Sequence, residues 1–274
     1  MYMSKYLFID TNVYTACAAE ELQGSDLNAL KKIKTELDGG RICLLVPEPI
    51  RVEVEKKIRV TFKKLGKDAQ LDPTSEKSNN PNKVNSNTAQ KDEKENLFDK
   101  GKKQKIKVIR ENAFKKMNEE IMSSLEKEEQ QANTLLESLF QHKNCTKIPL
   151  SGDALLSGMK RAALLQRPSP VDAKPDMPHY IKDMDCISFE MICEELSRLK
   201  KNNNTIEFLI CTTDSDYFEG EDLHPQILGS LRSYTEKQTG YKTMPELLEK
   251  EFSASVTPKQ KEVFNAIQED IQLS

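Results

Sequence analysis

The sequence predicts an α/β fold around a central parallel sheet. Short runs rich in β-branched and aromatic residues alternate with longer segments whose apolar residues recur at helical spacing. Two of the short runs, 5–9 and 206–211, are followed within three residues by an aspartate. Alternating strands and helices favour a parallel sheet with right-handed crossovers, so these aspartates are expected at one edge of it.

The first 66 residues contain two strand–helix pairs. The first strand is expected at 5–10, and the helix over 27–37 begins after a cap at Ser25 or Asp26 and stops at Gly39-Gly40. Pro47 closes the second strand, 41–46, and Pro49 opens a helix. The apolar stripe of that helix consists of Ile50, Val54, Ile58, Phe62 and Leu65.

The second half of the chain continues the alternation. A long helix is expected over 109–140, with an apolar stripe that includes Ile109 and Met117. Ser151 caps a shorter helix, on which Leu155, Met159, Ala162 and Ala163 are expected to point inward and Lys160 and Arg161 outward. The remaining elements are a helix over 185–199, a strand at 206–211, a short strand at 240–243 and a helix that starts at Pro245.

The expected domain organisation follows from a change of composition between residues 67 and 104. This stretch is rich in Lys, Asn, Asp and Ser and has few apolar residues, so it is predicted to be a disordered insertion. The single domain around it spans 1–66 and 105–252. A C-terminal tail, 253–274, is expected to be helical because Thr257-Pro258 is a typical helix start.

Composition narrows the class of protein. The 274 residues carry a net charge of −3, so any nucleic-acid binding must come from local patches. Three histidines and six scattered cysteines without a C-x-x-C pair argue against a zinc site. Reduced cysteines, no signal peptide and no long apolar stretch predict a cytoplasmic protein that does not engage a membrane.

Four acidic residues fall near the ends of predicted elements: Asp10, Glu53, Asp185 and Asp214. Asp185 is expected in the first turn of its helix, where a carboxylate suits the helix dipole. Ligands of open α/β sheets bind beyond the carboxyl ends of the strands. Clustered carboxylates repel one another unless a cation holds them, so this pattern predicts a Mg²⁺ or Mn²⁺ site that promotes attack on a phosphodiester.

Four stretches in this order resemble the motifs of PIN-domain nucleases. They are Phe8-Ile9-Asp10-Thr11-Asn12-Val13, Pro47-Glu48-Pro49-Ile50-Arg51-Val52-Glu53, Lys182-Asp183-Met184-Asp185-Cys186-Ile187 and Cys211-Thr212-Thr213-Asp214-Ser215-Asp216-Tyr217. The similarity is to a bacterial PIN-like branch that carries a domain of unknown function, and it covers about residues 4–252. It implies a three-layer α/β/α PIN-like domain with a central parallel sheet. It also implies a metal-dependent endoribonuclease that cleaves single-stranded RNA through a four-carboxylate site. A protein inhibitor or a defence-system component is a candidate partner.

Neighbouring residues receive supporting roles. Thr11 and Asn12 are candidates for orienting the first carboxylate or bound water, Thr212 and Thr213 for orienting water or phosphate, and Asp216 for assisting Asp214. Lys160, Arg161 and Lys182 are candidate phosphate contacts, although a solvated helix face explains the first two equally well. Three assignments stay open: Glu48 or Glu55 could replace Glu53, Asp183 could replace Asp185, and Asp216 could replace Asp214.

Two other functions compete with the nuclease. A PIN-like scaffold that has lost one carboxylate would bind RNA or a protein without cutting. A phosphatase or a structured-DNA nuclease would use the same edge of the sheet, but an aspartyl-phosphate phosphatase needs Asp-x-Asp after the first strand. Here Asp10 is followed by Thr11-Asn12. The sequence does not choose between RNA and DNA or indicate the oligomeric state.

Overall fold

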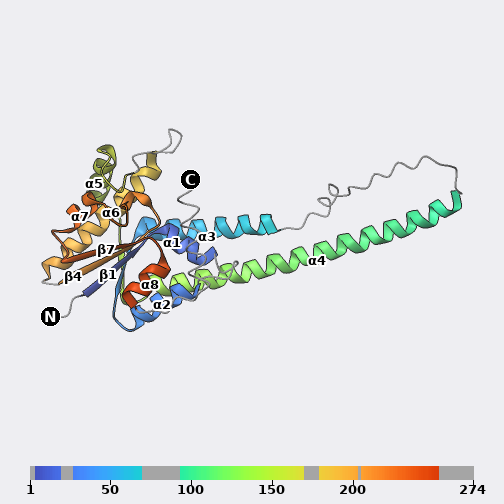
Figure 1. The fold of residues 1–274 in the computed structure, drawn as a ribbon, viewed down its shortest axis with the longest axis horizontal. Coiled ribbons are helices and arrows are strands. Elements are labelled where there is room, and N and C mark those ends of the chain that lie inside the picture. Colours follow the sequence, from blue (N-terminus) through green and yellow to red (C-terminus); the bar gives the residue numbers. More distant parts are fainter. Residues whose placement is uncertain (1–3, 20–26, 70–92, 170–178, 203–204, 253–274) are drawn as a thin grey trace. The chain divides into compact units, whose positions relative to one another are not determined.

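The computed structural model describes residues 4–19, 27–69, 93–169, 179–202 and 205–252 (Figure 1). It divides into two compact units. Unit 1 comprises Met1–Arg59 and Gln131–Ser274, and unit 2 comprises Val60–Gln130. The division differs from the predicted single domain, because part of two long helices forms a unit of its own.

Unit 1 is built on a five-stranded parallel sheet with the strand order β3-β2-β1-β4-β7. The strands are β1 (Ser4–Ile9), β2 (Cys43–Pro47), β3 (Cys145–Ile148), β4 (Ile206–Cys211) and β7 (Lys237–Tyr241). Every residue of β4 is buried, as expected for an almost continuously apolar strand that is covered on both faces. A separate two-stranded ribbon consists of β5 (Phe218–Glu219) and β6 (Asp222–Leu223).

Helices cover both faces of this sheet (Figure 1). Right-handed crossovers place the helices between β1, β2 and β3 on one face and those between β3, β4 and β7 on the other. The first group is α1 (Thr11–Ala19), α2 (Leu27–Asp38), α3 (Glu48–Ala69) and α4 (Glu93–Phe140), and the second is α5 (Gly152–Ala163), α6 (His179–Lys201) and α7 (Pro225–Leu231). Helix α8 (Met244–Phe252) contacts α2. The predicted α/β class and central parallel sheet are therefore confirmed.

Apolar side chains of both layers form the core. The predicted stripe of α3 is buried at Ile50, Val54 and Ile58, and Tyr14 packs edge-to-face on Phe140 with ring centroids 5.4 Å apart. The sequence analysis did not predict α1, β3, α7 or the ribbon of β5 and β6. Helix α1 follows Asp10 without a clear apolar stripe, and β3 is a four-residue edge strand with one buried residue. None of the described helices has both the length and the apolar character needed to cross a bilayer.

Unit 2 consists of the distal part of α3 and most of α4. Phe62 and Leu125 are buried within it, and a Cβ on Gly66 would lie 3.0 Å from Sδ of Met122, so glycine lets the two helices approach closely. The expected burial of Ile109 and Met117 is wrong, since their exposed fractions are 68% and 50%.

The predicted boundaries of the disordered insertion are also wrong. Residues 67–69 continue α3, and residues 93–104 belong to α4. The reason is that Lys, Glu and Gln are good helix formers, which ion pairs such as Lys115–Glu119 assist one turn apart. Residues 70–92 and the tail 253–274 lie outside the described residues.

Helix α5 is rotated relative to the prediction. Its buried residues are Ala154, Gly158 and Ala162, whereas Leu155, Met159 and Ala163 are exposed. A Cβ on Gly158 would lie 2.5 Å from Cα of Ile187 in α6. Only a face of small residues permits this close approach between the two helices, which is why the larger side chains turn outward. The predicted cap is confirmed, because Ser151 Oγ accepts a 2.9 Å hydrogen bond from Ala154 N.

Candidate functional site

The predicted acidic residues follow the two central strands of the sheet. The register pairs Ile9 with Cys211, so Asp10 and Thr212 leave β1 and β4 side by side. The sheet extends from β1 through β2 to β3 on one side and from β4 to β7 on the other. The strand order therefore runs outward in opposite directions from β1 and from β4. Such a topological switch point is where ligands bind in open α/β sheets.

Asp10 is an almost buried carboxylate, with an exposed fraction of 8%. Its Oδ1 accepts a 2.7 Å hydrogen bond from Thr11 N, and its Oδ2 accepts a 2.9 Å bond from Thr212 Oγ1. Burial raises the pKa of Asp10, the two hydrogen bonds oppose that rise, and the charge of Asp214 adds to it. Asp10 also stands at the start of α1, where its carbonyl accepts from Val13 N and Tyr14 N. Asp10 therefore starts a helix and also contributes its carboxylate to this edge of the sheet.

Thr212 connects the ends of the two central strands. It is fully buried, and its Oγ1 accepts a 3.0 Å hydrogen bond from Asp214 N while donating to Asp10. Asp214 in turn accepts a 2.9 Å bond from Asp216 N and caps the short 3₁₀ helix Ser215–Tyr217. Thr213 is exposed. The structure thus makes Thr212, rather than Thr213, the threonine that orients the acidic residues.

Asp185 projects toward the same edge from α6. Because α6 begins at His179, Asp185 lies in the second turn of the helix, and the expectation that it lies in the first turn is wrong. Burial raises its pKa to about 8, and the charges of Asp10, Asp214 and Glu53 raise it as well. Among the described residues, none donates a hydrogen bond to this carboxylate. The four predicted carboxylates therefore lie close enough together to repel one another.

Glu53 belongs to the same group but is partly solvated. Its side chain is 41% exposed, Oε2 accepts a 2.9 Å hydrogen bond from Thr11 Oγ1, and Oε1 lies 2.8 Å from Nζ of Lys57. Lys57 also donates a 3.0 Å bond to Oδ1 of Asn12. The rival Glu55 is exposed, whereas the charges of Asp10, Glu53 and Asp214 act on Asp185. Geometry therefore favours Glu53 and Asp185.

Two cations complete the site, and the sequence analysis did not single out either. Lys57 opposes the rise in pKa of Asp10 and Asp185. Arg167 forms an ion pair with Asp216, and its charge lowers the pKa of Asp214 against the larger effect of burial, which raises it. The spacing of Lys57 four residues after Glu53 was a usable signal. No local pattern marks Arg167, which lies in the connector after α5.

The three predicted phosphate contacts are Lys160, Arg161 and Lys182, and the structure places the first two in different surroundings. Arg161 donates to Glu190 Oε1 at 2.5 Å and to Ser230 Oγ at 3.0 Å, and its guanidinium lies 4.8 Å from the centroid of the Phe189 ring. These contacts place it in the packing between α5 and α6, so the predicted outward orientation is wrong. Lys160 is exposed on α5, and the side chain of Lys182 lies outside the described residues.

The four carboxylates are not arranged as a coordination sphere in this structure. Within the described residues, no three Asp, Glu, His or Cys side chains are arranged to hold a metal ion. Lys57 forms an ion pair with Glu53. Arg167 forms an ion pair with Asp216, which lies two residues after Asp214. The donor set is nevertheless of the hard, oxygen-only kind that Mg²⁺ and Mn²⁺ prefer.

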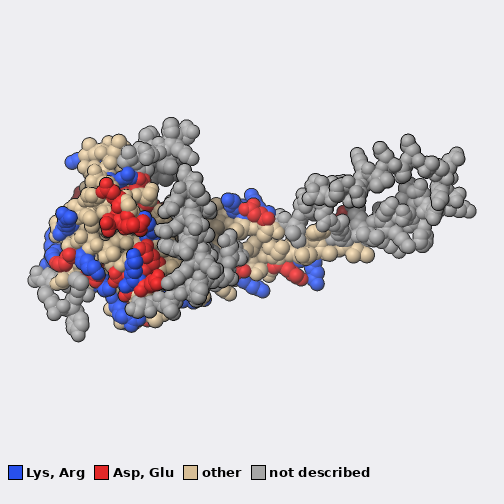
Figure 2. Space-filling model, in the orientation of Figure 1, with Lys and Arg blue, Asp and Glu red and all other residues tan. Residues whose placement is uncertain are grey.

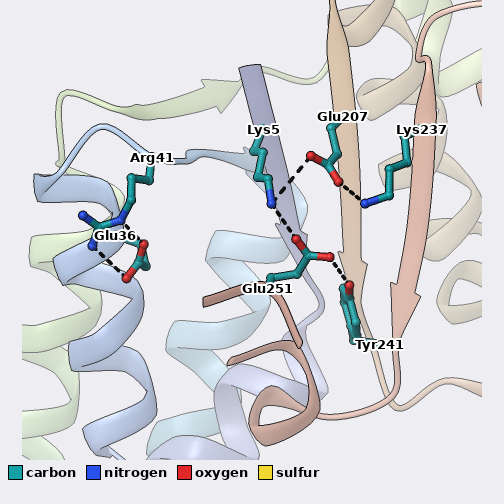
Figure 3. A network of polar contacts seen from close by, with 7 residues as sticks. All are labelled: Lys5, Glu36, Arg41, Glu207, Lys237, Tyr241 and Glu251. Carbon is teal, nitrogen blue, oxygen red and sulfur yellow. Dashed lines mark hydrogen bonds and ion pairs between the residues drawn. The ribbon is translucent and has the colours of Figure 1, made fainter. Parts of the chain in front are cut away.

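A cavity of about 500 Å³ lies at the opposite, amino-terminal edge of the sheet and is lined by Lys5, Arg41, Glu251 and Phe252 among others. The charged side chains named here each pair with an oppositely charged residue of the protein (Figure 3). Lys5 pairs with Glu251 at 2.6 Å and Glu207 at 3.6 Å, and Arg41 pairs with Glu36. Because no charge there lacks a partner, the carboxyl edge is the better candidate site.

The site therefore combines four carboxylates from β1, α3, α6 and the loop after β4 with Thr11, Thr212, Lys57 and Arg167. No protein-family model, curated protein or solved structure matches this chain.

Proposed function

We propose that this protein is a PIN-like, metal-dependent endoribonuclease that cleaves single-stranded RNA. One observation carries the proposal. The carboxylate of Asp185 is half-buried without a hydrogen-bond donor among the described residues, and the charges of three further carboxylates act on it. Such an arrangement is costly without a cation, and costly arrangements of titratable groups are typical of functional sites.

Asp10, Glu53, Asp185 and Asp214 would hold one or two Mg²⁺ or Mn²⁺ ions. A bound divalent ion supplies an acidified water molecule and neutralises the charge that develops on a phosphodiester under attack. The donor chemistry fits these ions, but a coordination sphere requires Glu53 to turn away from Lys57, to which it is bound at 2.8 Å. Since Glu53 is 41% exposed and lies on the helix surface, a rotamer change suffices for this movement.

The other residues of the site orient the carboxylates and balance their charge. Thr212 fixes Oδ2 of Asp10 and the backbone of Asp214, and Thr11 fixes Oε2 of Glu53. Lys57 forms an ion pair with Glu53 and Arg167 with Asp216, and both can contact a substrate phosphate. RNA as the substrate is taken from the motif resemblance.

A second function is favoured by one specific observation. The described residues contain no three-ligand cluster, and Lys57 already neutralises Glu53. A scaffold that binds RNA, or a protein partner, without cleaving it would retain this arrangement permanently.

The deciding experiment is a cleavage assay on labelled, mixed-sequence single-stranded RNA in Mn²⁺, Mg²⁺ or EDTA. The variants are Asp10→Asn and Glu53→Gln, and Glu55→Gln is the matched control because it removes an exposed carboxylate from the same helix. We expect the wild type and Glu55→Gln to cleave only with metal, and the other two to lose at least about a hundredfold in rate. A parallel assay on single-stranded DNA tests the choice of RNA.

The two functions give opposite results. Metal-independent cleavage, or equal rates for Glu53→Gln and Glu55→Gln, would refute the assignment of the site. If folded wild-type protein binds RNA in EDTA and in Mn²⁺ but cuts in neither, the scaffold is the correct function.

A further inference from the structure

Helix α5 buries its small residues and exposes its large ones. Ala154, Gly158 and Ala162 pack against α6, whereas Leu156 and Met159 on the outer face are 68% and 49% exposed. An ordinary surface helix shows the reverse arrangement, with its large apolar side chains in the core. The outer face of α5 therefore needs an explanation beyond packing within one chain.

The exposed apolar residues continue beyond both ends of the helix. They form what we call the α5 face, which consists of Leu150, Leu155, Leu156, Met159, Leu164 and Leu165. Together with Val52, these are all the exposed large hydrophobic residues described in unit 1. Figure 2 shows the surface at the position of α5 as mainly tan, the colour of residues that are neither acidic nor basic. Contiguous apolar patches of this kind usually mark interaction sites.

Leu165 follows the C-terminal end of α5. Its φ is +51°, in the left-handed region that costs a leucine about 1 kcal/mol or more, and its side chain is 58% exposed. Backbone hydrogen bonds from Leu165 N to Ala162 O and from Gln166 N to Arg161 O hold this conformation. These two bonds are the Schellman arrangement that ends many helices, and here it leaves the Leu165 side chain exposed at the end of the α5 face.

We propose that the α5 face is the contact surface of a two-fold symmetric homodimer, in which the α5 helices of two copies pack antiparallel. Charge supports a second copy as the occupant. Asp153 and Lys160 lie near opposite ends of α5 on the same flank of the apolar face, since residues 153, 156 and 160 share one side of a helix. Both are exposed, and no other described residue pairs with either.

Antiparallel packing makes this surface complementary to itself. Residues on the same flank meet across an antiparallel helix pair, so Asp153 of one copy lies beside Lys160 of the second copy, and the two-fold axis repeats the pair. A parallel pair would instead bring identical residues to the same level. The contact is modest, because a 12-residue helix is about 18 Å long and a standard interface buries about 800 Å² per partner. We therefore expect a dimer that dissociates on dilution.

Sedimentation velocity from about 1 to 100 µM tests the apolar part of the interface. We expect the wild type to shift from monomer to dimer over this range and Leu156→Asp to stay monomeric. Val52→Asp is the matched control, since Val52 is 53% exposed but lies apart on α3, and it should dimerise like the wild type. A wild type that stays monomeric throughout, or a Leu156→Asp variant that dimerises normally, would overturn the proposal.

A charge-reversal experiment tests the antiparallel geometry and does not depend on Leu156. Asp153→Lys and Lys160→Asp each place like charges opposite one another in a homodimer, so each alone should dimerise more weakly than the wild type. Mixing the two single variants creates a heterodimer in which both pairs are again of opposite charge. Preferential heterodimer formation, detected with a mass tag on one variant, is the expected result, and no preference in the mixture would overturn the antiparallel arrangement.

Discussion

The hydroxyl of Thr212 donates a 2.9 Å hydrogen bond to Oδ2 of Asp10 and so ties together the carboxyl ends of β1 and β4. The same oxygen accepts from Asp214 N at 3.0 Å. One buried side chain thereby sets the position of two of the four candidate carboxylates. The bond exists because the parallel register pairs Ile9 with Cys211, which brings the two following residues to the same level.

Thr212→Val should destabilise the protein by about 2 kcal/mol, because it leaves the buried Asp214 N–H and one Asp10 oxygen without a partner while keeping the shape of the side chain. Thr213→Val is the control, since Thr213 is exposed one residue further on. Denaturant midpoints at an unchanged m value give the comparison. Equal midpoints for the two variants would show that the Thr212 hydroxyl makes no net contribution to stability.

The raised pKa of Asp185 predicts that the free energy of unfolding depends on pH in an unusual way in EDTA. Its pKa is 3.8 when unperturbed and about 8 in the folded protein, because of burial and neighbouring carboxylates. Between these values the folded state keeps a proton that the unfolded chain has lost. The stability that this proton contributes is therefore fully present at low pH. It declines as pH rises from about 4 to 8, by up to about 1.4 kcal/mol per pH unit.

The Asp185→Asn variant should lose most of this decline and be more stable than the wild type near pH 8 in EDTA. Unfolding free energies at about pH 5, 6, 7 and 8 measure the slope. Asp222→Asn, which changes an exposed carboxylate on β6, should keep the wild-type slope. A wild-type stability that rises from pH 5 to 8 would contradict the raised pKa of Asp185.

Much of the fold was predictable because its central strands have strong local signals. β1 and β4 are short apolar runs bounded by polar turn residues, and β4 is buried along its whole length. The positions of Asp10 and Asp214 follow from those strands, because parallel strands end at a common edge. Glu53 was predictable from its neighbour Val54, which marks the buried side of α3.

The remaining features depend on contacts between distant segments. The register of α5 is set by the close approach of α6 at Gly158, and no periodicity within α5 reveals it. The role of Arg167 depends on Asp216, 49 positions further along the chain, which folding brings within ion-pairing distance. The helical residues at 93–104 were missed because a shortage of apolar residues was taken as a sign of disorder, although their helix propensity is high.

Lys57→Met should tighten Mn²⁺ binding by roughly two- to tenfold, because the ammonium group 2.8 Å from Glu53 Oε1 competes with a metal for the carboxylates. The same variant should be less stable in EDTA, where Lys57 is the cation that eases repulsion around Asp185. Calorimetric titration with Mn²⁺ and melting in EDTA give the two readouts. Lys56→Met, an exposed neighbour on α3, is the control and should leave both unchanged. Metal binding that is unchanged or weaker in Lys57→Met would show that Lys57 does not compete for the site.

Gly158→Ala should destabilise the protein by about 2 kcal/mol, although alanine is the better helix former by about 1 kcal/mol. The added Cβ would lie 2.5 Å from Cα and 2.7 Å from N of Ile187, and these backbone atoms cannot move without a shift of α6. Gly229→Ala is the matched control. Gly229 lies in α7 with no atom within 4 Å of a new Cβ, so this change should stabilise by about 0.5–1 kcal/mol. Because Asp185 precedes Ile187 by two residues on α6, Gly158→Ala should also reduce cleavage at temperatures where the variant is fully folded. Equal stability of the two variants would show that α5 and α6 have room to separate, and normal cleavage by a destabilised Gly158→Ala would show that the position of Asp185 tolerates that separation.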